Sequence, residues 1–201
     1  LSEKGFSEAS ISNLEHDAFD VLKQLSDNTT ETGPIKGLVV GSVQSGKTSH
    51  MTALMTMAAE YGWNVFIVVS GMIENLREQT LDRMDKELKE TNGSNIWVKI
   101  DKPSRHMIGA NSVYDRKLKS RRNEKLFTVI LKNKSWLNNL HEWLTLQPTN
   151  MSDMKILIID DEADYGSVNT SDLSNNEERK TINQQLVNIV GNKDPKGKLL
   201  P

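Results

Sequence analysis

A lysine and a threonine stand directly after a segment with two glycines, in an order that suits the binding of a polyphosphate. The segment reads Gly41-Ser42-Val43-Gln44-Ser45-Gly46-Lys47-Thr48, and it matches the phosphate-binding loop pattern G-x-x-x-x-G-K-[ST] at every required position. Phosphates bind where backbone N–H groups at the start of a helix point at them, and glycine allows the close approach that a Cβ would block. Lys47 would reach the β- and γ-phosphates, and the Thr48 hydroxyl would bind Mg²⁺. We therefore expect a nucleotide site over residues 41–48, the alternative being an ordinary glycine turn before a helix.

A second group of residues, at the end of the apolar run 156–159, is acidic. Its members are Asp160, Asp161, Glu162 and Asp164, which would repel one another unless a cation or hydrogen bonds compensate. Ligands of open α/β sheets bind beyond the carboxyl ends of the strands, so this cluster is expected to face the phosphate loop. Asp161 would hold Mg²⁺ and Glu162 would polarise the attacking water. A solvated acidic turn and a metal-dependent nuclease site are the alternatives, and the phosphate loop favours a nucleotide-bound metal.

The elements that must position these residues alternate between strand and helix from residue 36 to residue 160. This order predicts an α/β fold with a mostly parallel sheet and helices on both faces. One amphipathic helix precedes it, with Ser10 as the expected cap, and the helix over 73–90 is expected to turn Leu76 and Leu81 toward the core. The expected strands are 36–43, 64–70, 96–100, 127–132 and 155–160, and the expected later helices are 47–61, 73–90, 135–146 and 177–190.

Composition limits the class of protein. The chain has 201 residues, 36% of them hydrophobic, no cysteine, and a net charge of −2 from 25 basic and 27 acidic side chains. The absence of cysteine excludes disulfides and thiolate metal sites, and no apolar run approaches the roughly 18 residues of a membrane-spanning helix. We expect a cytoplasmic protein with no membrane partner. The near-neutral charge means that any contact with nucleic acid must come from a local patch, such as the basic segment 116–125, which ordinarily would be a solvated surface.

The acidic cluster and the phosphate loop also resemble a known family. Residues 161–164 spell the DEAD motif of superfamily 2 helicases, and 44–48 are similar to their motif I. The longer strings VVGSVQSGKTSHMTALM and ILIIDDEADYGSVNT resemble the Z1 domain family of bacterial helicase-like ATPases, which often occur near DNA restriction and modification genes. The resemblance implies a first RecA-like lobe over 35–201, preceded by a helix and linker over 1–34, with ATP and Mg²⁺ as cofactors. Its catalytic residues would be Lys47 and Glu162, and Asp164 would signal to a second lobe.

The same resemblance implies residues that contact nucleic acid, with DNA as the expected polymer. The segment around the end of the strand 64–70 is similar to motif Ia, where backbone N–H groups at a helix start meet a phosphate. Gly71 lies at that strand end, and Asn75, Gln79 and Arg83 fall close to one face of the following helix. Lys132 follows another strand, at a place where related proteins have a second strand-tracking loop. An ordinary polar helix surface and a strand-terminating turn are the alternatives.

The leading hypothesis is therefore the ATP-binding and hydrolysing lobe of a nucleic-acid-dependent helicase-like ATPase, with the second RecA-like lobe and DNA as partners. The sequence departs from that family in having no clear Q motif and no TATP-like motif III. The main alternative is a nucleotide-gated protein-interaction module that never binds nucleic acid, which the weak net charge favours modestly. A small-molecule kinase is a further alternative, opposed by the DEAD tetrad.

Overall fold

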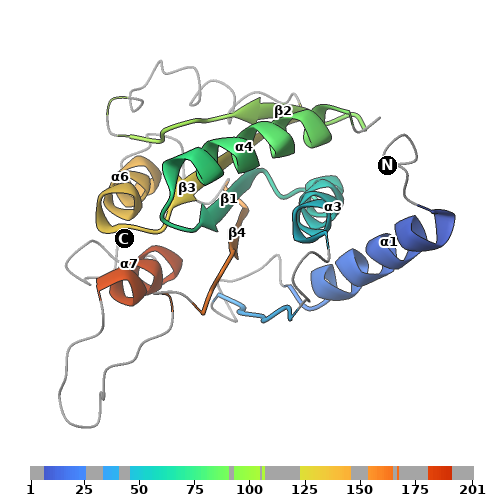
Figure 1. Ribbon diagram of the computed structural model, residues 1–201, viewed down its shortest axis with the longest axis horizontal. Coiled ribbons are helices and arrows are strands. Elements are labelled where there is room, and N and C mark those ends of the chain that lie inside the picture. Colours follow the sequence, from blue (N-terminus) through green and yellow to red (C-terminus); the bar gives the residue numbers. More distant parts are fainter. Residues whose placement is uncertain are drawn as a thin grey trace, which may run out of the picture.

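Strands that are apolar without interruption fit a sheet covered on both faces, and the computed structural model has such a sheet at its centre (Figure 1). It describes residues 7–25, 34–40, 46–90, 93–104, 106, 123–145, 154–164, 167 and 181–191. In chain order the elements are α1 (Glu8–Leu22), α3 (Lys47–Glu60), β1 (Val65–Ser70), α4 (Glu74–Lys89), β2 (Ile96–Lys99), β3 (Glu124–Leu131), α6 (Lys134–Thr145), β4 (Ile156–Asp160) and α7 (Thr181–Val190).

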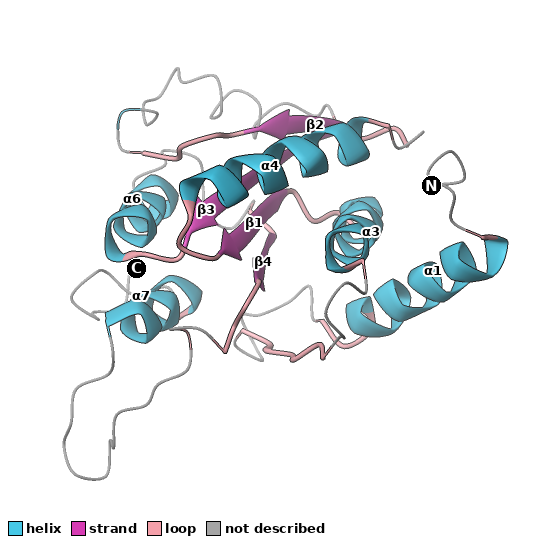
Figure 2. Ribbon diagram, in the orientation of Figure 1, coloured by secondary structure: helices cyan, strands magenta, loops and turns pink. Residues whose placement is uncertain are grey.

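The four described strands lie in the order β2-β3-β1-β4, and every pair is parallel. Residues alternate between the two faces of the sheet along each strand. Phe66 and Val68 of β1 face a core shared with α3 and α4, whereas Ile67 and Val69 face a core shared with α6 and α7. Figure 2 shows these helices arranged around the strands. The expected α/β class with a parallel sheet and helices on both faces is confirmed.

The described parts of the helices agree with the sequence pattern except in two details, and residues 177–180 of the expected last helix lie outside the described residues. The cap of α1 is Ser7, whose hydroxyl accepts a hydrogen bond from the Ser10 N–H at 3.1 Å, so the expected cap at Ser10 was wrong by one turn. On α4, Leu76 is 55% exposed and its neighbour Arg77 is fully buried. The expectation that Leu76 turns toward the core was therefore wrong, and the buried ion pairs of Arg77 hold that side chain there instead.

The expected strand over 36–43 is the one element that the structure contradicts. Residues 34–40 are described and form a loop, with Leu38, Val39 and Val40 exposed at 80%, 70% and 87%. A strand needs the hydrogen bonds of a neighbouring strand as well as apolar, β-branched residues. In the described part of the sheet, β4 ends the strand order, so its outer edge has no partner strand there. Residues 41–43, and with them most of the phosphate loop, lie outside the described residues.

Candidate active site

The register of the parallel sheet aligns the carboxyl ends of three strands. Ser70 of β1 pairs with Leu131 of β3, and Val69 of β1 pairs with Asp160 of β4. The residues that leave these strands are therefore brought together at one edge. They are Gly71, Lys132 and Asp161, and two of them are joined to β1 by backbone hydrogen bonds, from the Lys132 N–H to the Ser70 oxygen and from the Asp161 N–H to the Val69 oxygen.

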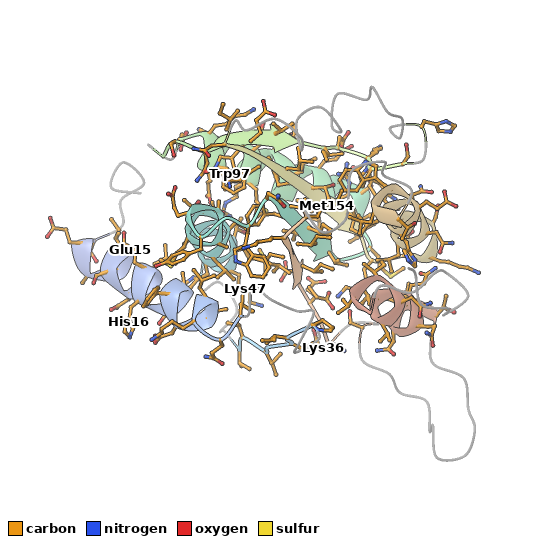
Figure 3. All side chains as sticks on the ribbon, turned by 180° about the vertical axis from the view of Figure 1, so that it is seen from behind. Glu15, His16, Lys36, Lys47, Trp97 and Met154 are labelled. Atoms are coloured by element: carbon orange, nitrogen blue, oxygen red, sulfur yellow. The ribbon has the colours of Figure 1, made fainter. Side chains whose placement is uncertain are left out.

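The helix that follows the expected phosphate loop begins at Lys47, the position that the motif predicts. α3 starts at Lys47, directly after Gly46, which has a φ of 75° in the left-handed region that glycine adopts without steric cost. The Gly46 oxygen accepts the N–H groups of Ser49 at 2.9 Å and His50 at 3.2 Å, which closes the first turn. Lys47, which Figure 3 labels, is exposed in that turn, and Thr48 is half-buried. The expected nucleotide ligands Gly41, Ser42, Val43, Gln44 and Ser45 lie outside the described residues.

The far end of α3 lies at the amino edge of the sheet. There the N–H groups of Asn64 and Val65 both donate to the Lys155 oxygen at 3.2 Å, just ahead of β4. With 14 residues the helix is about 21 Å long, which matches the roughly 20 Å of a six-residue strand such as β1. Among the described residues no hydrogen bond or ion pair joins Lys47 or Thr48 to the acidic residues after β4. Of the motif, Gly46, Lys47 and Thr48 are thus placed at the start of α3.

The acidic residues after β4 form a tight turn with an unusual backbone. Glu162 has a φ of 56°, the only positive φ of a non-glycine residue in the part of the chain that the structure describes. This left-handed conformation costs roughly 1–2 kcal/mol for a residue with a Cβ, and such residues persist where their surroundings impose the conformation. The Glu162 N–H donates to Asp161 Oδ1 at 3.1 Å. Glu162 and Asp164 are exposed and Asp161 is half-buried, so the carboxyl groups face solvent at the site edge.

Lys132 occupies a position that the sequence did not suggest. Its side chain is 1% exposed, and its Nζ donates to the oxygens of Asp161 at 2.8 Å and Glu162 at 2.7 Å. The same ammonium forms an ion pair with Asp160 Oδ1 at 2.7 Å. In this arrangement the ammonium contacts the acidic turn and has almost no surface to offer to a phosphate, which differs from the expected contact with nucleic acid.

The other residues expected to contact nucleic acid lie on or beside α4. Asn75, Gln79 and Arg83 are exposed and follow one another at intervals of four residues, so they form one row along the helix. Arg83 Nε also donates to Glu87 Oε1 at 3.2 Å, which holds the guanidinium along the helix. Gly71 is next to the acidic turn, because a Cβ on it would lie 2.8 Å from Glu162 Oε2.

A buried arginine fixes the first turn of α4. Arg77 donates to both carboxylate oxygens of Glu74 at 3.0 and 3.1 Å, to the Val129 oxygen at 3.1 Å, and pairs with Asp101 at 3.0 Å. Burial works to lower the pKa of Arg77, but the bonds to the two carboxylates outweigh it and the net shift is upward. The hydrogen bond from Arg77 holds the pKa of Glu74 below its ordinary value, with Lys102 contributing. The exposed row on α4 therefore starts from an anchored turn.

The roles of two residues were missed at the level of sequence. Arg77 was given no role, and Lys132 was expected to contact nucleic acid, with a strand-terminating turn as the alternative. The available signal for Lys132 was its place directly after the apolar strand FTVIL, which is buried throughout. A cation that closes a buried strand needs acceptors nearby, and another strand of the same chain ends in carboxylates.

The donor atoms at this edge suit magnesium in their chemistry. Mg²⁺ prefers oxygen ligands, and it usually takes one or two from the protein and the rest from phosphates and water. Thr48 offers a hydroxyl and Asp161 a carboxylate, which fits that pattern. Within the described ranges no three histidine or acidic side chains cluster closely enough to hold a metal by themselves. Nor does any described helix combine the length and apolar character needed to cross a membrane.

Comparisons with family models, with curated proteins and with solved structures found no significant match.

Proposed function

We propose that this chain is the ATP-binding lobe of a nucleic-acid-dependent ATPase of the helicase-like, superfamily 2 type, with a resemblance to the Z1 domain family. The observation that carries the proposal is the start of α3, where Lys47 and Thr48 open a helix directly after a left-handed Gly46, as a phosphate loop requires. The acidic turn at the carboxyl edge of an all-parallel sheet supports it, because ligands of open α/β sheets bind at that edge.

In this proposal the protein groups have separate tasks. Backbone N–H groups of residues 41–48 hold the phosphates, and Lys47 neutralises charge at the β- and γ-phosphates. Thr48 and Asp161 hold Mg²⁺, which stabilises the charge that develops on the phosphate oxygens. Glu162 accepts the proton of a water that attacks the γ-phosphorus, while the bond to the bridging oxygen breaks and ADP leaves. Asp164, exposed at the end of the turn, would face a second RecA-like lobe of the parent protein.

A DNA contact is the less direct part of the proposal. It is supported by the exposed row Asn75, Gln79 and Arg83, which begins near Gly71 at the same edge. A nucleotide-gated module that binds another protein through this row is the alternative, and the net charge of −2 is compatible with it.

The test is ATP turnover by the full-length parent protein, with and without single- and double-stranded DNA, beside Glu162→Gln and Lys47→Ala. We expect turnover that DNA stimulates. Glu162→Gln should lower kcat at least about 100-fold and leave the Kd for Mg-ATP nearly unchanged, since a general base contributes about 10²–10⁴. Lys47→Ala should weaken nucleotide binding itself. ATP turnover that neither single- nor double-stranded DNA changes would favour the nucleotide-gated module. ATP hydrolysis that persists in Glu162→Gln would reject the role of Glu162 as general base.

A further inference from the structure

Three oxygens lie in contact with the Lys132 ammonium, two as hydrogen-bond acceptors in the acidic turn and one as an ion-pair partner at the end of β4. They are the carbonyl oxygens of Asp161 and Glu162 and a carboxylate oxygen of Asp160, all within 2.7–2.8 Å. A lysine that is 1% exposed is costly unless its charge is paired and its protons are bonded. This lysine therefore makes a specific set of contacts with one turn.

Those contacts fall on the two peptide groups that flank the strained residue. The oxygens of Asp161 and Glu162 belong to the carbonyls before and after the Glu162 φ and ψ, so a cation that holds both restricts these dihedral angles. The Glu162 φ of 56° needs such a restraint, because a side chain with a Cβ disfavours it. On its other side the Glu162 carboxylate lies against Gly71, where no Cβ stands in its way.

We propose that Lys132 is a positioning residue that holds the turn after β4 in its left-handed form and so aims the Glu162 carboxylate at the attacking water. This inference rests on the proposed ATPase function. Lys132 reaches the turn from β3, although β1 lies between β3 and β4 in the sheet. The simpler role, neutralising Asp160, would require the ion pair alone and would leave the two carbonyl contacts without a purpose.

The experiment uses the full-length protein and four variants. Lys132→Met removes the ammonium and keeps an apolar stem of similar length. Lys132→Met/Asp160→Asn also removes the carboxylate that would otherwise be left beside an apolar group, so it isolates the loss of the carbonyl contacts. Lys132→Arg keeps the charge and tests rescue. Lys125→Met is the matched control, because Lys125 is also a buried lysine of β3 but lies at the opposite end of the strand, away from the turn.

Three readouts are needed: kcat and KM for ATP, the Kd for Mg-ATP, and hydrogen exchange of the amides of residues 161–164. We expect Lys132→Met to lower kcat about 100-fold, the scale of effect seen when a reacting group is misplaced by about 1 Å, with KM and Kd changed less than about threefold. Exchange at 161–164 should be at least tenfold faster. The double variant should regain stability and remain slow, Lys132→Arg should recover part of kcat, and Lys125→Met should behave as the parent.

Two results would overturn the proposal. Recovery of kcat in the double variant would mean that Lys132 only neutralises Asp160. Unchanged exchange at 161–164 in Lys132→Met would mean that the ammonium does not hold the turn. The exchange measurement needs no ATP. A full-length protein without ATP turnover would refute the proposed function, and the exchange at 161–164 would still decide whether Lys132 holds the turn.

Discussion

At the scale of a single residue, the left-handed backbone of Glu162 should lower the free energy of unfolding of the protein. A left-handed conformation suits glycine, and Glu162 adopts it with a φ of 56°. We expect Glu162→Gly to have a larger free energy of unfolding than Glu162→Ala by about 0.5–1 kcal/mol, because alanine keeps the Cβ that crowds this conformation. Both variants lose the carboxylate and should lose hydrolysis. Urea unfolding of the two, with equal m values, measures the difference.

The control pair for that prediction is Glu74→Gly and Glu74→Ala, in the first turn of α4. There the backbone is helical and the order should reverse, with alanine the more stable variant by up to about 1 kcal/mol. If alanine were the more stable variant at both positions, the left-handed backbone of Glu162 would carry no strain.

Gly71 should matter through the side chain beside it. A Cβ on Gly71 would lie 2.8 Å from Glu162 Oε2 and 3.7 Å from its carboxyl carbon. The end of a flexible side chain can move away at little cost, so Gly71→Ala should change the free energy of unfolding by less than about 0.5 kcal/mol. The displaced carboxylate should nevertheless lower kcat about tenfold or more. Gly93→Ala is the control, since its Cβ would only approach the exposed Glu60 Oε1 at 3.4 Å, and a kcat equal in both variants would contradict the prediction.

At the scale of elements, the segment before the expected phosphate loop and the outer edge of β4 each lack a strand partner among the described residues. Residues 34–40 form a loop with three exposed apolar side chains, and β4 has no second partner strand among the described residues. A phosphate loop ordinarily follows a strand, and burying a valine or leucine fully is worth about 1.5–3 kcal/mol. We expect residues 38–40 to pair with β4 when Mg-ATP binds, and their amides should then exchange at least tenfold more slowly.

Hydrogen exchange with and without a non-hydrolysable ATP analogue measures that protection. Lys47→Ala, which should bind the nucleotide weakly, serves as the control and should show none of it. Equal exchange at 38–40 in the free and the saturated protein would show that the segment stays a loop during binding.

These elements also show what the sequence could and could not predict. Uninterrupted apolar runs located the strands around Val65–Ser70 and Ile156–Asp160, and apolar residues at helical spacing located the helices near them. The absence of a strand over the described residues 36–40 could not be predicted in this way. An apolar pattern indicates a tendency to form a strand, but it does not show whether a neighbouring strand is there to pair with. Leu76 was assigned to the core for a similar reason, because two of the groups that bind Arg77, the Val129 oxygen and Asp101, lie outside α4.

The site was predictable to the extent that its residues are close in sequence. The expected phosphate loop and the acidic turn are each a single short string, so a chemistry could be proposed for them from residue types. The contact of Lys132 with Glu162 joins residues 30 positions apart across an intervening strand. It depends on the register of three strands, which no local pattern contains.

At the scale of the whole molecule, the charge decides how DNA could be bound. A net charge of −2 means that a nucleic-acid contact would rest on a few local groups, and Arg83 is the cation of the exposed row on α4. Binding of DNA releases counterions in proportion to the phosphates contacted, so the slope of log K against log salt counts those contacts. For the full-length protein in the presence of an ATP analogue we expect Arg83→Gln to make that slope shallower by about 0.7 on single strands. Glutamine keeps a donor for Glu87, so the helix should remain intact.

Lys23→Ala is the matched control, because Lys23 is also an exposed cation paired with a carboxylate of its own helix region, Asp20 at 2.7 Å. It changes the net charge equally and should leave the slope unchanged. Equal slopes in all three proteins would remove Arg83 from the nucleic-acid contact, and binding without any salt dependence would favour a protein partner for this face.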